Sequence, residues 1–420
     1  MPFCKRIVLI LILLLLPPLL PADTIPADKA LDYQVAALVS GRCFNLALWE
    51  VEAVLSKLKD LAVDPAARLD EAAARRLVLD YVATARRIGE LEGAIIRAAG
   101  NPQRPDSQQS VAAWRAELDR LRLRQAERRD VVEAILERQV ASVLAEEELT
   151  TLGLLWPPLK FHFSEPPLYL IISPRQRIAL RKGVHLRADL SLSEREAIEA
   201  AVDNRLPDYV SLVEDIGGFG TYPTMVIDNA SLPWILNTIA HEWTHNYLAF
   251  RPLGWHYFDD NDTVTLNETV ASIVGDEIGG KVLKRYYPDQ VPPRKRPSEV
   301  RPLHIPELAP PRFDFNREMR RVRLRVDELL AQGRVAEAEA FMEEQRRRFV
   351  AHGYALRKLN QAYFAFHGSY ATAPSAVDPI GPKMTRLRRA SPSLRAFLET
   401  ASRFTSVEDL DRALEEVGGR

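Results

Sequence analysis

The chain has 420 residues, of which 47% are hydrophobic and 27% are charged, and its formal net charge is −1. This composition is that of a globular protein with a sizeable core, either in two or three domains or as one catalytic core with helical additions. The nearly balanced charge argues against a nucleic-acid-binding protein, and we expect no nucleic-acid partner.

The first 23 residues are typical of an export segment. Two basic residues precede an apolar run over 7–16, and prolines and Ala22 follow it. This pattern predicts a signal peptide, with an uncleaved membrane anchor as the alternative. In either case we expect an extracytoplasmic protein, secreted or held at the outer face of the cytoplasmic membrane by this segment alone. Cleavage would leave Cys43 as the single cysteine, so we expect no intrachain disulfide.

A helical, coiled-coil-like domain is predicted over residues 27–150. The stretches 28–61, 65–99 and 110–149 are rich in helix-forming residues, and Gly41 is the single breaker within the first. A break containing glycine and prolines separates the last two, which predicts a long antiparallel hairpin with 28–61 packed alongside. The alternatives are an arm that binds a partner and a domain that covers one side of a catalytic unit.

A catalytic core is predicted over residues 156–290. Aromatic and branched residues bounded by prolines predict strands at 159–164 and 168–172, with one or two more between 177 and 190. His162 and His185 fall in these strands without metal-ligand spacing to the motif below, so we interpret both as ordinary strand residues.

Two short elements lead into the motif. A capped helix is predicted over 193–202. The glycine-rich residues 217–220 are expected to be a flexible loop that enters the last strand before the motif helix. The open edge of that strand could pair with an extended peptide.

The helix predicted over 231–248 carries the motif His-Glu-x-x-His. His241 and His245 stand at i and i+4 on one helix face, where two imidazoles can bind a single tetrahedral metal ion. Glu242 then lies close enough to act as a general base for a water molecule. The alternative is two unrelated histidines on an amphipathic helix.

A second helix, predicted to begin near Thr265, supplies a candidate third ligand. Glu268 follows His245 by 23 residues, and two histidines with one glutamate and an open fourth position make a catalytic zinc site. The alternative is a capping box between Thr265 and Glu268. Glu277 and the acidic residues 259–262 are then the fallback ligands. We interpret 259–262 as a solvated turn rather than a calcium loop.

In this region the chain resembles the gluzincin group of zinc metallopeptidases, in which His-Glu-x-x-His is followed by a glutamate on a second helix. The pair Asn267-Glu268 with Ala271 is similar to the N-E-x-x-A form of aminopeptidase-like members, and the layout is loosely similar to predicted bacterial zinc aminopeptidases. The resemblance covers residues 217–285. It implies three zinc ligands and a general base, namely His241, His245, Glu268 and Glu242.

The chain departs from that group in two respects. Many members have an aspartate four residues after the ligand glutamate, which orients a zinc-bound histidine. Here that position is Ser272, and Asp276 is the candidate to replace it. The amine-recognition sequence G-x-M-E-N of one large aminopeptidase family is absent, which leaves aminopeptidase specificity open.

Residues 291–420 are predicted to be a helical subdomain. Two helices between 315 and 352 form a hairpin, and a third runs over 354–370. Three residues of the third helix share one face and are candidates to stabilise negative charge during catalysis: Tyr363, His367 and Tyr370. A buried aromatic stripe is the alternative.

The sequence therefore predicts a mainly helical α+β protein. Its parts are a long N-terminal helical hairpin, a small antiparallel or mixed sheet packed on a zincin-like active-site helix pair, and a helical C-terminal part. The favoured function is an exported zinc metallopeptidase with a peptide or protein substrate, whose activity falls in acid as the histidines protonate. The alternatives are a zinc amidase or esterase and a non-catalytic extracytoplasmic scaffold with a structural or vestigial zinc site. The oligomeric state is left open.

Overall fold

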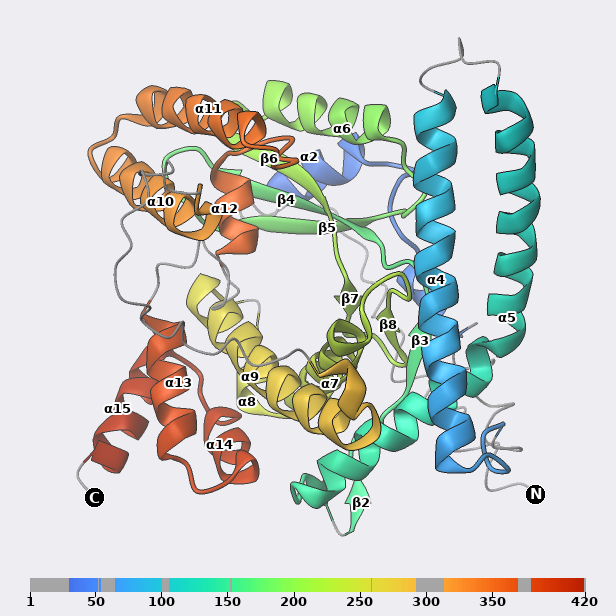
Figure 1. Ribbon diagram of the computed structural model, residues 1–420. Coiled ribbons are helices and arrows are strands. Elements are labelled where there is room, and N and C mark those ends of the chain that lie inside the picture. Colours follow the sequence, from blue (N-terminus) through green and yellow to red (C-terminus); the bar gives the residue numbers. More distant parts are fainter. Residues whose placement is uncertain are drawn as a thin grey trace, which may run out of the picture. The chain divides into compact units, whose positions relative to one another are not determined.

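A computed structural model describes most of the chain (Figure 1). The described residues are 30–51, 53, 65–99, 106–151, 153–257, 259–291, 313–368 and 379–418. Two compact units divide at Gly41, and the described part of the first is helix α2 (Ala30–Leu38) with the turn that follows it. The predicted export segment lies outside the described residues.

The helix predicted over 28–61 is interrupted. Helix α2 ends at Leu38, and Gly41 adopts a left-handed φ of +74°. This conformation is accessible to glycine at little cost and cannot continue a right-handed helix. A separate helical stretch begins at residue 46.

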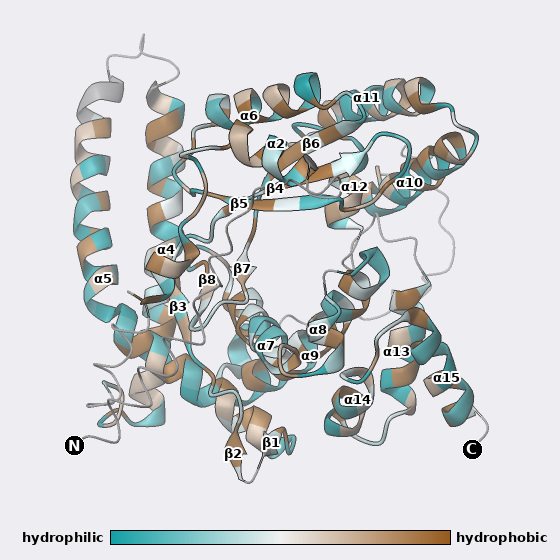
Figure 2. Cartoon of the chain, turned by 180° about the vertical axis from the view of Figure 1, so that it is seen from behind, coloured by the Kyte–Doolittle hydropathy of each residue, from teal (hydrophilic) through white to brown (hydrophobic). Residues whose placement is uncertain are grey.

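The predicted long hairpin is confirmed by α4 (Glu71–Ala99) and α5 (Asp106–Glu146), which lie side by side in Figure 1. Ile88 and Leu91 of α4 pack with Leu118 of α5 in a small hydrophobic cluster. Toward the other end, α5 also contacts α7 and α9. In Figure 2 both helices carry hydrophilic and hydrophobic residues in alternation, as expected for helices that bury part of their surface.

One sheet is antiparallel and has three strands. Strand β4 (Leu168–Pro174) lies between β5 (Lys182–Leu186) and β6 (Tyr209–Asp215). Helix α6 (Leu192–Arg205) packs on β6, and α12 (Gln361–His367) packs on β4 and β6. The prediction located β4, β5 and α6 but missed β6.

The second three-stranded sheet is mixed and packs on the motif helix. Strand β3 (Phe161–Phe163) is parallel to β8 (Thr224–Val226), which is antiparallel to β7 (Gly218–Phe219). Both β7 and β8 contact α7. The glycine-rich segment predicted as a loop therefore includes a short strand. A two-stranded ribbon joins β1 (Thr150–Thr151) to β2 (Leu154–Leu155).

Helix α5 covers the outer edge of β3 with two carboxylates one turn apart. Glu133 accepts a hydrogen bond from the backbone N–H of Phe163 at 2.7 Å, and Glu137 accepts one from Phe161 at 3.2 Å. These two N–H groups point away from β8, so the carboxylates replace a missing strand.

Helix α6 covers the outer edge of β6 in the same way. Glu199 accepts from the N–H of Val213 at 2.7 Å, and Asp203 accepts from Ser211 at 2.8 Å. Glu199 is buried, and Arg357 donates to both of its oxygens. Burial alone would raise the pKa of Glu199, but Arg357, Lys358 and the Val213 N–H together lower it.

The C-terminal part is helical, as predicted. Helices α10 (Phe315–Ala331) and α11 (Val335–Ala351) form the expected hairpin and share a core with α12. Helix α12 is shorter than predicted and begins after Asn360, whose side chain caps it. Helices α13 (Ile380–Ala390), α14 (Leu394–Ala401) and α15 (Val407–Gly418) pack on a second, larger core around α7 and α9. In the part of the chain that the structure describes, no helix combines the length and apolar character that crossing a membrane requires.

Candidate metal centre

The candidate site lies on two antiparallel helices that pack against each other, α7 (Leu232–Leu248) and α9 (Asn261–Tyr286). Two glycines of α9 permit this approach. A Cβ at Gly275 would lie 2.9 Å from the carbonyl oxygen of Asn237, and one at Gly279 would lie 2.7 Å from the Asn237 nitrogen. The Gly-x-x-x-Gly spacing therefore sets how closely α9 lies against α7, and with it the position of Glu268.

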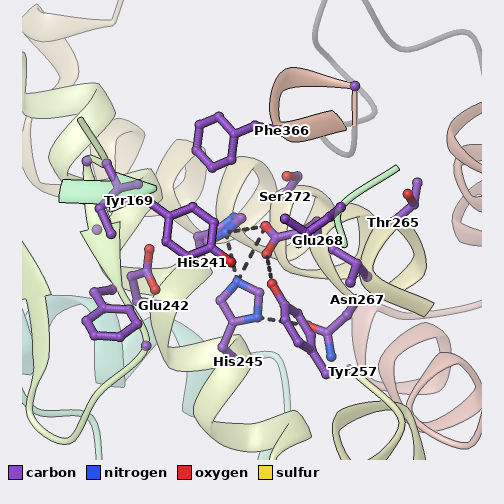
Figure 3. A pocket seen from close by; sticks show the side chains of 18 of the residues that line it. Tyr169, His241, Glu242, His245, Tyr257, Thr265, Asn267, Glu268, Ser272 and Phe366 are labelled. Carbon is purple, nitrogen blue, oxygen red and sulfur yellow. Dashed lines mark hydrogen bonds and ion pairs between the residues drawn. The ribbon is translucent and has the colours of Figure 1, made fainter. Parts of the chain in front are cut away.

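Three side chains converge between the helices (Figure 3). The Nε2 atoms of His241 and His245 are 3.1 Å apart, and Oε2 of Glu268 lies 3.4 Å from the first and 3.6 Å from the second. Ligands about 2.0–2.1 Å from one tetrahedral zinc ion are separated by roughly 3.3 Å. Among the described residues, the buried Oε2 atom of Glu268 has no hydrogen-bond partner. The three residues could hold a metal ion, and both the spacing and the unsatisfied oxygen fit one.

Two neighbouring side chains orient these ligands. The Tyr257 hydroxyl donates a 2.7 Å hydrogen bond to Oε1 of Glu268, and Nδ1 of His245 lies 2.8 Å from Oδ1 of Asn267. Such contacts fix ligand orientation at metal sites. Neither role was predicted, because Tyr257 is close to Glu268 only after the turn between the two helices forms. Asp276, expected to orient a histidine, instead accepts a hydrogen bond from Asn237.

The alternatives for Glu268 do not hold. Helix α9 begins at Asn261 with Asp260 as its N-cap, so Thr265 lies within the helix and its hydroxyl donates to the Asn261 carbonyl. The alternative of a capping box is therefore wrong, and the helix starts four residues earlier than expected. The fallback ligand Glu277 accepts hydrogen bonds from Arg388 at 2.9 Å and does not join the triad.

Glu242 is buried beside the triad, with 7% of its surface exposed. Strand β7 passes directly over it, and a Cβ at Gly218 would collide with the Glu242 carboxylate. A side chain at this position would displace the Glu242 carboxylate, which explains the glycine at 218. Burial raises the pKa of Glu242; the two histidines oppose this rise and Glu268 adds to it.

The charges of the triad are strongly coupled. Burial alone would lower the pKa of His245, but the Glu268 carboxylate outweighs it and raises the pKa to about 9. Burial would raise the pKa of Glu268, but His245 and His241 outweigh burial, and its pKa is lowered. The carboxylate is therefore ionised, as a metal ligand must be.

The triad opens into a cleft of about 790 Å³. Helices α7 and α9 form one side of it. Tyr169 of β4, His185 of β5 and Phe366 of α12 line the opposite side. The cleft thus lies between the two hydrophobic cores, and each contributes one wall.

The three residues of the third C-terminal helix that were predicted to stabilise negative charge are not found together at the cleft. Tyr363 is buried in the core shared by α10 to α12, and His367 lies 3.6 Å from Glu214; neither lines the cleft. Tyr370 lies outside the described residues. Sequence reasoning missed Tyr169, which does line the cleft. Burial and the Glu268 charge raise its pKa to about 12, so it remains a hydrogen-bond donor.

The two strand histidines do not join the triad. His162 lies 3.1 Å from Glu133 at the edge of β3. The His185 ring lies 4.9 Å from that of Tyr169 and 4.3 Å from that of Phe219, and burial lowers its pKa to about 4.

Comparison of the chain with protein-family models, with curated proteins and with solved structures gave no match.

Proposed function

We propose that the protein is a zinc metallopeptidase of the gluzincin type. One observation carries the proposal: the Nε2 atoms of His241 and His245 and the unpartnered Oε2 of Glu268 lie 3.1 to 3.6 Å apart in an open cleft. Glu242 adjoins them in the order that the gluzincin pattern requires. A structural zinc site is normally closed by four protein ligands, whereas this triad leaves a position open.

The side chains take distinct roles in the proposed reaction. His241, His245 and Glu268 would hold the ion, with Tyr257 and Asn267 fixing two of them. A bound zinc ion supplies a Lewis acid that polarises a carbonyl and lowers the pKa of water to about 7. Glu242 takes a proton from the attacking water and delivers it to the leaving amine.

Tyr169 is the donor that we assign to the negative charge developing on the carbonyl oxygen. It lines the cleft opposite the triad, and Figure 3 shows its ring directed toward the histidines. Its raised pKa keeps the hydroxyl protonated at neutral pH. A hydrogen-bond donor placed where charge develops in the transition state lowers the barrier.

The substrate that best fits the cleft is an extended peptide. Within the described part of the chain, β7 pairs with β8 alone, so its other edge is available for strand addition beside Glu242. Main-chain hydrogen bonds to β7 would hold the peptide across the triad. We further propose that the protein acts outside the cytoplasm, because its first 23 residues have the pattern of an export segment.

The test combines metal content with turnover. The full chain should contain one zinc per molecule and cleave members of a mixed peptide library, and a chelator should abolish cleavage. Glu242→Gln should retain the zinc and lose nearly all hydrolysis. Glu277→Gln is the matched control, because Glu277 is on α9 but pairs with Arg388 and Lys281.

Three results would contradict the proposal. A fully active Glu242→Gln variant would contradict the role of Glu242 as the general base. Turnover of esters or non-peptide amides without any peptide would indicate the amidase or esterase function. One zinc per molecule with no turnover of any substrate would indicate a scaffold.

A further inference from the structure

The floor of the cleft continues beyond the triad along both helices. Asn237 lies one turn before His241 on α7, and Asp276 lies two turns after Glu268 on α9. Because the helices are antiparallel, these positions meet, and the Asn237 side-chain amide donates a hydrogen bond to Oδ1 of Asp276. Both residues line the cleft.

Asp276 differs from Asp215 and Arg323, two other charged residues that line the cleft. Asp215 pairs with Arg195 at 3.0 Å, and Arg323 pairs with Asp327 at 2.9 Å. Asp276, by contrast, has no lysine or arginine within ion-pair distance among the residues that the structure describes. Its carboxylate is solvent-accessible, and its interactions are the hydrogen bond from Asn237 and the electrostatic attraction of His241.

Helix α7 also presents an aromatic side chain to the cleft. Trp234 is one turn before Asn237 on the same face of α7, lines the cleft and is 39% exposed. The backbone of Gly217 lies directly against its indole, since a Cβ there would contact the ring. An indole and a carboxylate that line one cleft are a combination that binds ammonium and guanidinium groups.

We propose that Trp234, Asn237 and Asp276 form a subsite for a positively charged group of the substrate. This inference rests on the proposed peptidase function and specifies its substrate. The group is a free amino terminus or a lysine or arginine side chain, which share this chemistry. One helical turn from His241 to Asn237 is roughly 5–6 Å. An extended peptide covers that distance in about two residues, so the charge lies close to the reacting bond.

The test measures binding separately from turnover. Zinc-loaded Glu242→Gln protein is titrated with short peptides that carry a C-terminal fluorophore, and anisotropy gives the Kd. Matched peptides carry lysine or norleucine at successive positions, each with a free or an acetylated amino terminus. We expect at least one cationic form to bind about tenfold more tightly than the acetylated norleucine peptide, the range of a desolvated cation–π and charge contact. Acetylation removes this gain if the amino terminus is bound and preserves it if a side chain is bound.

Two further substitutions assign the gain to the subsite. In the same background, Asp276→Asn keeps the shape of the side chain. It should abolish the difference in affinity between cationic and neutral peptides. Asp215→Asn, in the same cleft but paired with Arg195, should preserve it. Equal affinities for cationic and neutral peptides, or a difference that survives Asp276→Asn, would overturn the inference. Failure of the proposed function appears separately, as absent peptide cleavage by the wild-type protein.

Discussion

The Tyr257 hydroxyl donates a 2.7 Å hydrogen bond to one oxygen of the Glu268 carboxylate, and the other oxygen of that carboxylate faces two imidazoles. The bond fixes the plane of the carboxylate, so that Oε2 is directed into the site. It also satisfies the oxygen that a single metal ion would not use. Tyr257 thereby links the turn before α9 to the geometry of the triad.

Loss of this hydrogen bond should weaken metal binding without abolishing it. We expect Tyr257→Phe to lower zinc affinity by about tenfold, the lower end of the effect of residues that orient metal ligands. Competition with a chromophoric chelator measures the affinity. Tyr169→Phe is the control, since it removes a cleft hydroxyl that donates no hydrogen bond to the triad, and its zinc affinity should match wild type. Equal affinity in all three proteins would contradict the role of Tyr257.

The close approach of α7 and α9 depends on Gly279. In Gly279→Ala the new methyl group would lie 2.7 Å from the Asn237 backbone nitrogen, and the helices must move apart. We expect a loss of about 1–3 kcal/mol in the free energy of unfolding, together with weaker zinc binding.

Gly280→Ala provides the comparison, because a Cβ there meets no atom within 4 Å. Its higher helix propensity should stabilise the protein by up to about 1 kcal/mol. Urea denaturation of both variants measures the difference. A destabilised Gly280→Ala, or a Gly279→Ala as stable as wild type, would contradict the claim that the close approach of α7 and α9 requires glycine at position 279.

Acid should destabilise the protein partly through His185. Burial lowers the pKa of His185 to about 4 from 6.5, so between these values the unfolded chain binds more protons than the folded one. Stability due to this residue is therefore complete above pH 6.5 and declines as the pH falls toward 4. At pH 5 the loss amounts to about 2 kcal/mol.

The variant His185→Phe keeps an aromatic ring between Tyr169 and Phe219 but cannot titrate. Its free energy of unfolding should decline less than that of wild type between pH 7.5 and pH 5, by about 2 kcal/mol. Urea denaturation at each pH gives the comparison, and other titrating groups cancel in the difference. Identical pH profiles for the two proteins would show that His185 is not held neutral.

The carboxylates on α5 should stabilise the mixed sheet. Glu133→Leu leaves the buried N–H of Phe163 without its 2.7 Å acceptor, which costs about 1–3 kcal/mol. Glu133→Gln keeps an acceptor oxygen and should lose less. Denaturation with urea ranks the variants, and equal losses would mean that the charge of Glu133, rather than its hydrogen bond to the strand, provides the stability.

Much of the site could be predicted because its pattern is local. His241 and His245 are four residues apart in a segment whose sequence clearly predicts a helix. Their shared face therefore follows from helical geometry alone. Glu268 was identified because a metal site needs a third ligand. The long hairpin and the helices of the C-terminal part were also readable from helical periodicity.

Strand β6 and the residues that support the triad could not be read in this way. Residues 209–215 form an edge strand of the antiparallel sheet because β4 pairs with them on one side and α6 covers the other. Tyr257 and Tyr169 belong to no motif, and the motif that contains Asn267 did not indicate its contact with His245. Gly275 and Gly279 appear in the sequence as unfavourable residues within a helix, and their purpose is evident only beside Asn237.

The sequence by itself determined the two histidine ligands, because i, i+4 spacing on one helix requires no knowledge of the rest of the chain. Only the tertiary structure decided the remainder. It placed Glu268 against the histidines through the contact of two helices, and it brought Tyr169, not Tyr363 or His367, to the cleft wall. Among the described residues it left Asp276 without a lysine or arginine partner. Each of these depends on contacts between residues far apart in the chain, whose geometry local propensity does not encode.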